Sequence, residues 1–320
     1  MIEWYTIHPT KKEKELATPM SIAIIVHGGA GNISPERTAD AKAGCKEAAS
    51  IGWQILQNGG SALDAVEAAV RALEDNPQFN AGRGACLNKE GKIELDAGIM
   101  DGNTLTVGAI AGVQLIQNPI SLARRVQESE HAFLIGAGAE FFAKEQGFDF
   151  CRYEDLLTEH QYNAWKHHDS TALTYEAKES SEKPKKHGTV GAVAIDSEGH
   201  LAAATSTGGI LNKYPGRVGD SPLVGCGFYA DEHAAISCTG YGEDFTRLMI
   251  AQRTASGVAQ GHTAQEAAEA SIRFLSEHAE GDGGLIVVDR NGNVGKARNS
   301  EHIAHAYITE QMAEPSADIF

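Results

Sequence analysis

The chain has 320 residues, a length that allows one large domain or two ordinary ones. Hydrophobic residues make up 42% and charged residues 22%, and the 35 glycines follow no collagen-like or low-complexity period, which is typical of a soluble globular protein. The formal net charge of −16 opposes a phosphate backbone, and no basic stripe with interleaved aromatic residues offsets it. Nucleic acid and anionic membrane surfaces are therefore excluded as expected partners.

The cysteines and the N-terminus give no sign of an oxidising compartment. Five cysteines form no C-x-x-C pair and no cluster at zinc-ligand spacing, and their number is odd. We interpret them as reduced packing residues. Residues 1–20 are polar and mixed in charge, and the apolar run at 22–26 is too short for a signal sequence or a membrane span. We expect a cytoplasmic protein, with translation starting at Met1 or Met20.

The first half of the chain predicts one strand followed by helices. The β-branched run at 22–26 indicates a buried strand that leads into a glycine-rich loop at 27–31. Two amphipathic helices are expected at 35–57 and 62–75, with Ser61 and Asp64 placed to cap the second. A turn-rich loop follows, and the remaining elements expected here are strands near 93–95 and 105–115 and helices near 119–128 and 140–145.

The second half begins after a weakly patterned segment. From about 152 to 187 periodicity fades and polar residues dominate, which indicates an exposed linker of low order. The elements expected beyond it are strands at 189–196 and 201–206, helices near 243–256 and 264–278, and a hairpin of 285–289 with a strand from Val294. Hairpins flanked by helix pairs favour antiparallel sheets covered by helices, so the pattern predicts a layered α/β sandwich with two halves.

The end of the linker places a hydroxyl directly after a glycine, in His187-Gly188-Thr189. Alone, these residues are explained by a turn glycine and a β-favouring threonine at the start of a strand. Five other motifs accompany them: His-Gly-Gly-Ala-Gly at 27–31, Phe-Asn-Ala-Gly at 79–82, Ala-Thr-Ser-Thr-Gly-Gly at 204–209, Gly-Arg-Val-Gly-Asp-Ser-Pro at 216–222, and Ser-Cys-Thr-Gly-Tyr-Gly-Glu at 237–243.

In this order, the motifs resemble those of the plant-type L-asparaginases and isoaspartyl peptidases, over about residues 22–297. The resemblance implies an α+β fold of the N-terminal-nucleophile type, a four-layer αββα sandwich whose precursor cuts itself between Gly188 and Thr189. It implies an N-terminal extension (1–20), an α subunit (21–188) and a β subunit (189–320) that together form one globular domain, and a homodimer of such αβ pairs.

The implied chemistry rests on a free N-terminal threonine. Its α-amine has a reference pKa of about 8 and can accept the proton of its own hydroxyl, so one residue is both base and nucleophile. Before cleavage this amine is an amide nitrogen, and the precursor is expected to be inactive on substrate. By resemblance, Thr207 hydrogen-bonds the nucleophile Thr189, Thr239 and Gly240 form the oxyanion hole, and Asn80 lies close by.

Arg217 and Asp220 lie three residues apart across a glycine. They offer a fork for an α-carboxylate and an acceptor for an α-ammonium. A simple ion pair within an exposed loop would also explain the spacing. Within the resembling motif they predict recognition of a free aspartyl head group, so the expected substrates are β-aspartyl dipeptides and L-asparagine.

No cofactor is expected for catalysis. The resemblance implies a structural sodium ion held by backbone carbonyls of Leu73, Glu74, Asn76, Phe79, Ala81 and Arg83. Two bulky residues depart from the family pattern: Tyr241 follows the oxyanion glycine, and Arg83 precedes Gly84. Either would reshape the leaving-group side of the pocket.

Three alternatives remain. Residues 133–141, Phe-Leu-Ile-Gly-Ala-Gly-Ala-Glu-Phe, have the strand, glycine turn and helix of a dinucleotide-binding module, but Phe141 stands where the third glycine belongs. A glycosylasparaginase of the same fold would carry His-Asp-Thr where this chain has His187-Gly188-Thr189. An uncleaved scaffold protein is disfavoured by the intact set of site residues.

Overall fold

The computed structural model describes residues 21–172 and 188–320. The strands are β1 (Ala23–Gly31), β2 (Leu95–Asp101), β3 (Thr106–Val113), β4 (Phe133–Ile135), β5 (Val190–Ile195), β6 (Leu201–Thr207), β7 (Phe228–Ala230), β8 (Ala234–Gly240), β9 (Gly283–Asp289), β10 (Val294–Arg298), β11 (His302–Thr309) and β12 (Ser316–Ile319). The helices are α1 (Pro35–Gln57), α2 (Ala62–Asp75), α3 (Pro119–Gln127), α4 (Gly136–Glu145), α5 (Tyr153–Leu156), α6 (Glu159–Ala172), α7 (Gly242–Leu248), α8 (Ile250–Ala259) and α9 (Ala264–His278).

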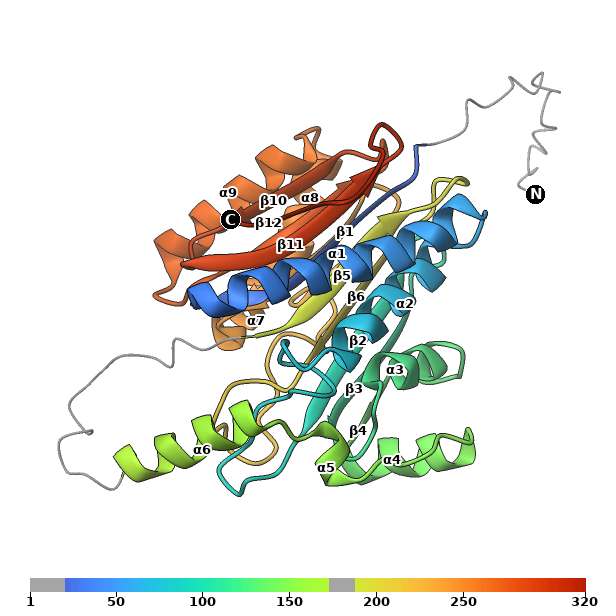
Figure 1. Ribbon diagram of the computed structural model, residues 1–320. Coiled ribbons are helices and arrows are strands. Elements are labelled where there is room, and N and C mark those ends of the chain that lie inside the picture. The colour runs from blue at the N-terminus through green and yellow to red at the C-terminus, as the bar shows by residue number, and fades with distance from the viewer. Residues whose placement is uncertain (1–20, 173–187) are drawn as a thin grey trace, which may run out of the picture.

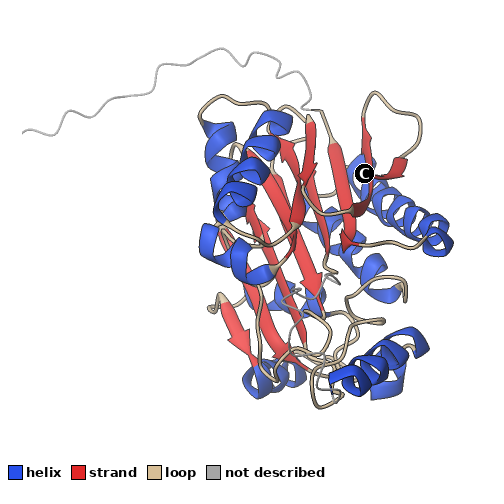
Figure 2. Cartoon of the chain, turned by 90° about the vertical axis from the view of Figure 1, so that its left-hand side faces the viewer, coloured by secondary structure: helices blue, strands red, loops and turns tan. Residues whose placement is uncertain are grey.

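Two β-sheets form the centre of the molecule. The larger has the order β12-β11-β1-β5-β6-β2-β3-β4, and the smaller has the order β10-β9-β8-β7. Neighbouring strands are antiparallel except for the parallel pair β3 and β4. Helices lie on the outer side of both sheets (Figures 1 and 2). The predicted antiparallel sheets covered by helices are confirmed.

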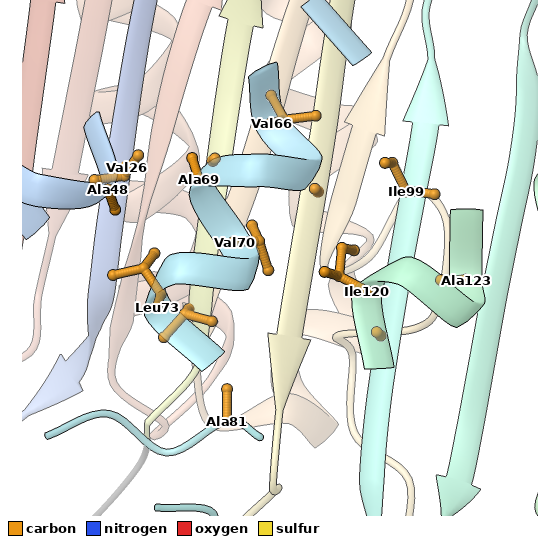
Figure 3. Close-up of a cluster of buried hydrophobic side chains, with 14 of the residues drawn as sticks. Val26, Ala48, Val66, Ala69, Val70, Leu73, Ala81, Ile99, Ile120 and Ala123 are labelled. Carbon is orange, nitrogen blue, oxygen red and sulfur yellow. The ribbon is translucent and has the colours of Figure 1, made fainter. Parts of the chain in front are cut away.

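Three hydrophobic clusters define four layers. In the first, α1, α2 and α3 pack on the large sheet; Val66, Val70 and Ile120 lie in this interface (Figure 3). The second fills the space between the sheets, and the third joins the small sheet to α8 and α9. β5 is buried along its whole length, because other layers cover both of its faces. A strand in this position needs apolar side chains on both faces. The αββα sandwich is therefore confirmed.

Local signals set the ends of the best-predicted helices. The bounds of α1, α2 and α9 agree with the prediction. Pro35 occupies the first turn of α1, where its missing N–H costs nothing. The Ser61 hydroxyl accepts a hydrogen bond from the Asp64 amide at 3.1 Å and so caps α2. Thr263 and Glu266 form a capping box at the start of α9.

Several predictions were wrong. The strand expected at 93–95 lies at 95–101, and the helix expected at 243–256 is broken at Met249, which has φ of 49°. The segment from 152 onward is not all linker, because α5 and α6 occupy 153–156 and 159–172. α6 is polar along most of its length, and its apolar contacts are made by few side chains such as Trp165, so hydrophobic periodicity did not reveal it. Residues 173–187 of the expected linker lie outside the described residues.

All five cysteines are free thiols. Within residues 21–172 and 188–320, no helix is long and apolar enough to cross a membrane.

Candidate functional site

The junction between Gly188 and Thr189 lies immediately before β5, where the chain enters the core. Thr189 is buried, with 5% of its surface exposed. The carbonyl oxygen of Gly188 accepts two hydrogen bonds, from Asn80 Nδ2 at 2.9 Å and from Thr207 Oγ1 at 2.8 Å. Two donors aimed at one carbonyl can stabilise negative charge on its oxygen, which makes its carbon a target for a nucleophile.

Thr207 connects this carbonyl to the Thr189 hydroxyl. The Thr189 hydroxyl donates to Thr207 Oγ1 at 3.3 Å, and the Gly209 amide donates to the same oxygen at 2.9 Å. Thr207 therefore donates its own hydroxyl proton to the Gly188 carbonyl. The sequence cannot bring these residues together; the antiparallel pairing of β5 with β6 does, with Val190 opposite Ser206.

The Asn80 side chain is held in one orientation. Its Oδ1 accepts from the Cys86 amide at 2.8 Å, and its Nδ2 donates to the Gly209 carbonyl at 2.7 Å as well as to Gly188. A backbone bond from the Gly208 amide to the Asn80 carbonyl, at 3.0 Å, ties the loop to the end of β6. The amide is thus preorganised toward the junction.

The glycine-rich end of β1 closes the other side of Thr189. Gly29 has φ of +104°, and a Cβ atom there would lie 2.9 Å from the Thr189 nitrogen, so only glycine lets the two backbones approach. The next residue, Ala30, donates its amide to Thr239 Oγ1 at 2.8 Å. Because that bond uses an acceptor site of the hydroxyl, the Thr239 proton stays available to a substrate oxygen.

Arg217 and Asp220 line one small cavity together with Thr189, Thr207 and Gly240. Of the described residues, the carboxylate that pairs with Arg217 is that of Glu243, whose oxygens lie 2.9 Å from Nε and 2.7 Å from Nη2. The alternative explanation of their spacing, a simple ion pair between Arg217 and Asp220, is therefore wrong.

Asp220 is buried, and among the residues that the structure describes its Oδ2 has no hydrogen-bond partner. Burial raises the pKa of its carboxyl to about 7, against the opposing effect of the Arg217 charge. A buried carboxyl oxygen without a partner is costly unless a ligand supplies the missing donor. Asp220 is thus suited to receive a cationic group.

Three residues that sequence reasoning missed hold this site. Glu243 fixes the Arg217 guanidinium, as above. Glu94 accepts the Gly216 amide on both carboxylate oxygens at 3.1 Å and so anchors the loop that carries Arg217. The buried Lys213 ammonium donates to the Glu94 carbonyl at 2.9 Å. Glu243 stood in a quoted motif, but nothing in the sequence assigned it a partner.

The two bulky departures, Tyr241 and Arg83, are not among the residues that line the cavities adjoining Gly188. Their effect on the leaving-group side stays a prediction. Arg83 instead donates its backbone amide to the Glu74 carbonyl at 2.8 Å, which closes the loop at 76–84.

Carbonyl oxygens converge at two glycines of that loop. A Cβ atom at Gly82 would lie 2.7 Å from the Glu74 oxygen and 2.8 Å from that of Gln117. One at Gly84 would lie 2.6 Å from the Phe79 oxygen and 2.8 Å from that of Pro77. Among the described side chains there is no group of three or more His, Cys, Asp or Glu residues that could hold a metal ion.

The αββα sandwich and the threonine at the head of a buried central strand define an N-terminal-nucleophile hydrolase fold. The asparaginase family model matches residues 20–316, and the chain belongs to this family. It is 46% identical over 271 residues to the isoaspartyl peptidase/L-asparaginase of Danio rerio, covering 84% of this chain and 86% of the relative. It is 47% identical over 310 residues to the plant-type L-asparaginase of Pyrococcus furiosus, covering 93% and 100%.

The mouse protein named isoaspartyl peptidase/L-asparaginase is also 47% identical, over 277 residues, covering 86% of this chain and 84% of the relative. These names favour the asparaginase interpretation over the glycosylasparaginase and dinucleotide-binding alternatives.

Changing Thr189 tests whether this residue cuts the chain. We expect wild-type protein to separate into two fragments, one beginning at Thr189, because its hydroxyl lies beside a carbonyl that already receives two hydrogen bonds. Thr189→Ala should abolish cleavage and turnover, whereas Thr189→Ser should retain part of both. Mass spectrometry of the denatured proteins measures this, and normal fragments from the alanine variant would assign the cut to another residue.

Proposed function

We propose that this protein is an isoaspartyl peptidase and L-asparaginase that activates itself by cleavage before Thr189 and then releases L-aspartate from β-aspartyl dipeptides and L-asparagine. The observation that carries the proposal is the single cavity in which Thr189, Arg217, Asp220 and Gly240 meet. A hydroxyl nucleophile, an anion-binding fork, a cation acceptor and an oxyanion-hole amide are the groups that this reaction requires.

Self-cleavage begins with attack of Thr189 Oγ1 on the Gly188 carbonyl carbon. The oxygen takes up negative charge, and Asn80 and Thr207 donate to it. The C–N bond then breaks, the nitrogen takes the proton that the Thr189 hydroxyl gives up and becomes the α-amine of Thr189, and an ester joins Gly188 to the threonine oxygen. Water hydrolyses this ester, which leaves a carboxylate on Gly188 and restores the hydroxyl.

Cleavage also makes room for substrate. Before the cut, the cavity beside Thr189 has a volume of ≈10 Å³, enough for about one water molecule. An aspartyl group is larger than that. Gly188 lines the cavity, so its departure enlarges the space in front of Thr189. Activation thus supplies both the free amine and the volume.

In the mature enzyme, Arg217 receives the substrate α-carboxylate on the guanidinium N–H groups that Glu243 does not use, and Asp220 receives the α-ammonium. The side-chain amide then faces Thr189. The α-amine takes the hydroxyl proton as Oγ1 attacks, and the Thr239 hydroxyl with the Gly240 amide stabilises the oxyanion. The amine returns the proton to the leaving nitrogen, and water releases aspartate from the ester.

The head-group assignment predicts a strict isomer preference. Mature enzyme should hydrolyse β-Asp-Leu and, less efficiently, L-asparagine, but not α-Asp-Leu, because the α-linked isomer lacks the free α-carboxylate that Arg217 binds. Arg217→Leu should lower kcat/KM by an amount that corresponds to a loss of about 2 kcal/mol or more in transition-state stabilisation, because a charge-assisted fork is lost. Steady-state kinetics with Arg273→Leu, an exposed arginine on α9, provides the matched control. Equal rates on both isomers would overturn the assignment.

The raised pKa of Asp220 predicts a pH effect on substrate capture. Below about pH 7 the carboxyl is protonated and cannot pair with an α-ammonium, so kcat/KM should fall as pH decreases through this value. The Thr189 amine has a reference pKa of about 8 and must also be deprotonated to act as a base, so its protonation lowers kcat/KM further as pH decreases. Wild-type log kcat/KM should therefore approach a slope of about 2 below pH 6, and Asp220→Asn a slope of about 1. Identical slopes would show that Asp220 does not titrate in this range.

We further propose that the predicted carbonyls of this loop bind a sodium ion; among them, that of Glu74 lies close to Gly82 and that of Phe79 lies close to Gly84. The carbonyls of Leu73 and Asn76 accept the Asn76 and Phe79 amides, so these ligands bind through their second lone pairs. The ion would stabilise the loop that holds Asn80 and takes no part in bond making. A higher Tm in sodium chloride than in choline chloride of equal ionic strength is expected; identical Tm values would contradict it.

The assembly and its location extend the same proposal. We infer a homodimer of αβ pairs from the family resemblance, and a cytoplasmic location from the sequence. Light scattering of the active fraction is expected to give the mass of two αβ pairs. A mass corresponding to one pair would exclude the dimer.

A further inference from the structure

A second cavity adjoins Gly188 and is not used by the head group. Its volume is ≈470 Å³, within the range of about 300–1,000 Å³ that is usual for small-molecule sites. Gly28 to Ser34, the loop around Asn80, and His160 from α6 contribute to its walls, and so does Arg37 of α1. We propose that this cavity is the leaving-group subsite, in which Arg37 binds the free carboxylate of the amino acid released from a β-aspartyl dipeptide.

The position of the two cavities supports this assignment, which rests on the function proposed above. Both cavities are lined by Gly188, but only the small one is lined by Arg217 and Asp220. When these two residues hold the aspartyl head group and the amide carbon lies at Thr189, the leaving nitrogen points away from them. The space on that side is the second cavity.

Arg37 is a cation whose hydrogen-bond partners are uncharged. Its Nε donates to Gln78 Oε1 at 3.1 Å, its Nη2 donates to the Gln78 carbonyl, and its Nη1 contacts His160 Nε2 at 3.4 Å. Throughout the described ranges, no carboxylate forms an ion pair with it. Asp40, one turn along α1, is reached by the Gln78 side-chain amide at 3.4 Å instead. One N–H on each Nη atom is left for a ligand.

The contacts of Gln78 place this guanidinium near the scissile position. Gln78, which binds Arg37 through two oxygens, lies two residues before Asn80, and Asn80 Nδ2 donates to the Gly188 carbonyl at 2.9 Å. Two Cα–Cα steps span at most about 7.6 Å. The same short loop therefore binds the Arg37 guanidinium through Gln78 and the Gly188 carbonyl through Asn80.

Charge on the remaining walls sets the direction of the ligand. Asp282 and Glu301 also line the cavity. They repel a carboxylate, whereas Arg37 attracts one, so an anionic leaving residue is oriented toward α1. In a dipeptide substrate the amine of the leaving residue is consumed in the β-aspartyl amide bond, which leaves its carboxylate as the only backbone charge to be recognised. Blocking that carboxylate or removing the residue removes the contact.

Three substrates and two variants test the subsite. Mature wild type, Arg37→Gln and Arg37→Lys are compared on β-Asp-Leu, β-Asp-Leu carboxamide and L-asparagine, after mass analysis confirms equal cleavage. Arg125→Gln, an exposed arginine on α3, serves as the control. We expect wild type to prefer the free acid over the carboxamide at least tenfold in kcat/KM. Arg37→Gln should lose this preference while its rates on the carboxamide and on asparagine stay within about twofold of wild type. Arg37→Lys should restore part of it.

Two outcomes would overturn the subsite. The first is equal wild-type rates on acid and carboxamide, a comparison that needs no variant. The second is an Arg37→Gln variant that loses activity on all three substrates alike, which indicates a structural role. Failure of wild type on every β-aspartyl substrate and on asparagine would instead contradict the proposed function itself, and the subsite with it.

Discussion

The site depends on one carbonyl group held at the edge of a buried strand. The Gly188 oxygen is fixed by Asn80 and Thr207 at the point where the chain enters β5, between a small cavity and a large one. The strand order explains why this point is so well defined, because β5 lies between β1 and β6 and is buried throughout. β1 brings its glycine loop from one side, and β6 brings Thr207 from the other.

In the mechanism that we propose, this arrangement lets one set of groups act in two reactions. Before cleavage, the Thr207 proton is committed to the Gly188 carbonyl, and the Thr189 hydroxyl donates to Thr207. When Gly188 leaves, Thr207 loses that acceptor but keeps its contact with the nucleophile. Thr239 is held ready throughout by the Ala30 amide. On this proposal, the precursor is organised for an attack on its own backbone, and the product of that attack is organised for substrate.

The sequence predicted the layers and the motif residues, but not what links them. Helices α2 and α9 have side-chain caps and amphipathic faces, and α1 has a proline in its first turn, so their limits were correct. Strands β7, β8, β11 and β12 were not predicted, because their register depends on neighbours distant in the chain. α6 is too polar to show periodicity, although it walls the second cavity. Contacts such as that of Glu243 with Arg217 join residues far apart in the sequence, so no short motif reveals them.

The charges of the small cavity show how an aspartyl group can be selected. Arg217 already has a carboxylate partner in Glu243, so an incoming α-carboxylate adds to a satisfied guanidinium. Asp220 has no such partner at Oδ2, and its burial makes the ionised form costly until a cation arrives. A ligand without an α-ammonium would leave this carboxyl buried and unpaired. Sites built around an unsatisfied polar group reject analogues that lack the complement far more strongly than apolar pockets do. If Asp220 binds the α-ammonium as we propose, it favours substrates with a free α-amine and excludes β-aspartyl groups acylated at that nitrogen.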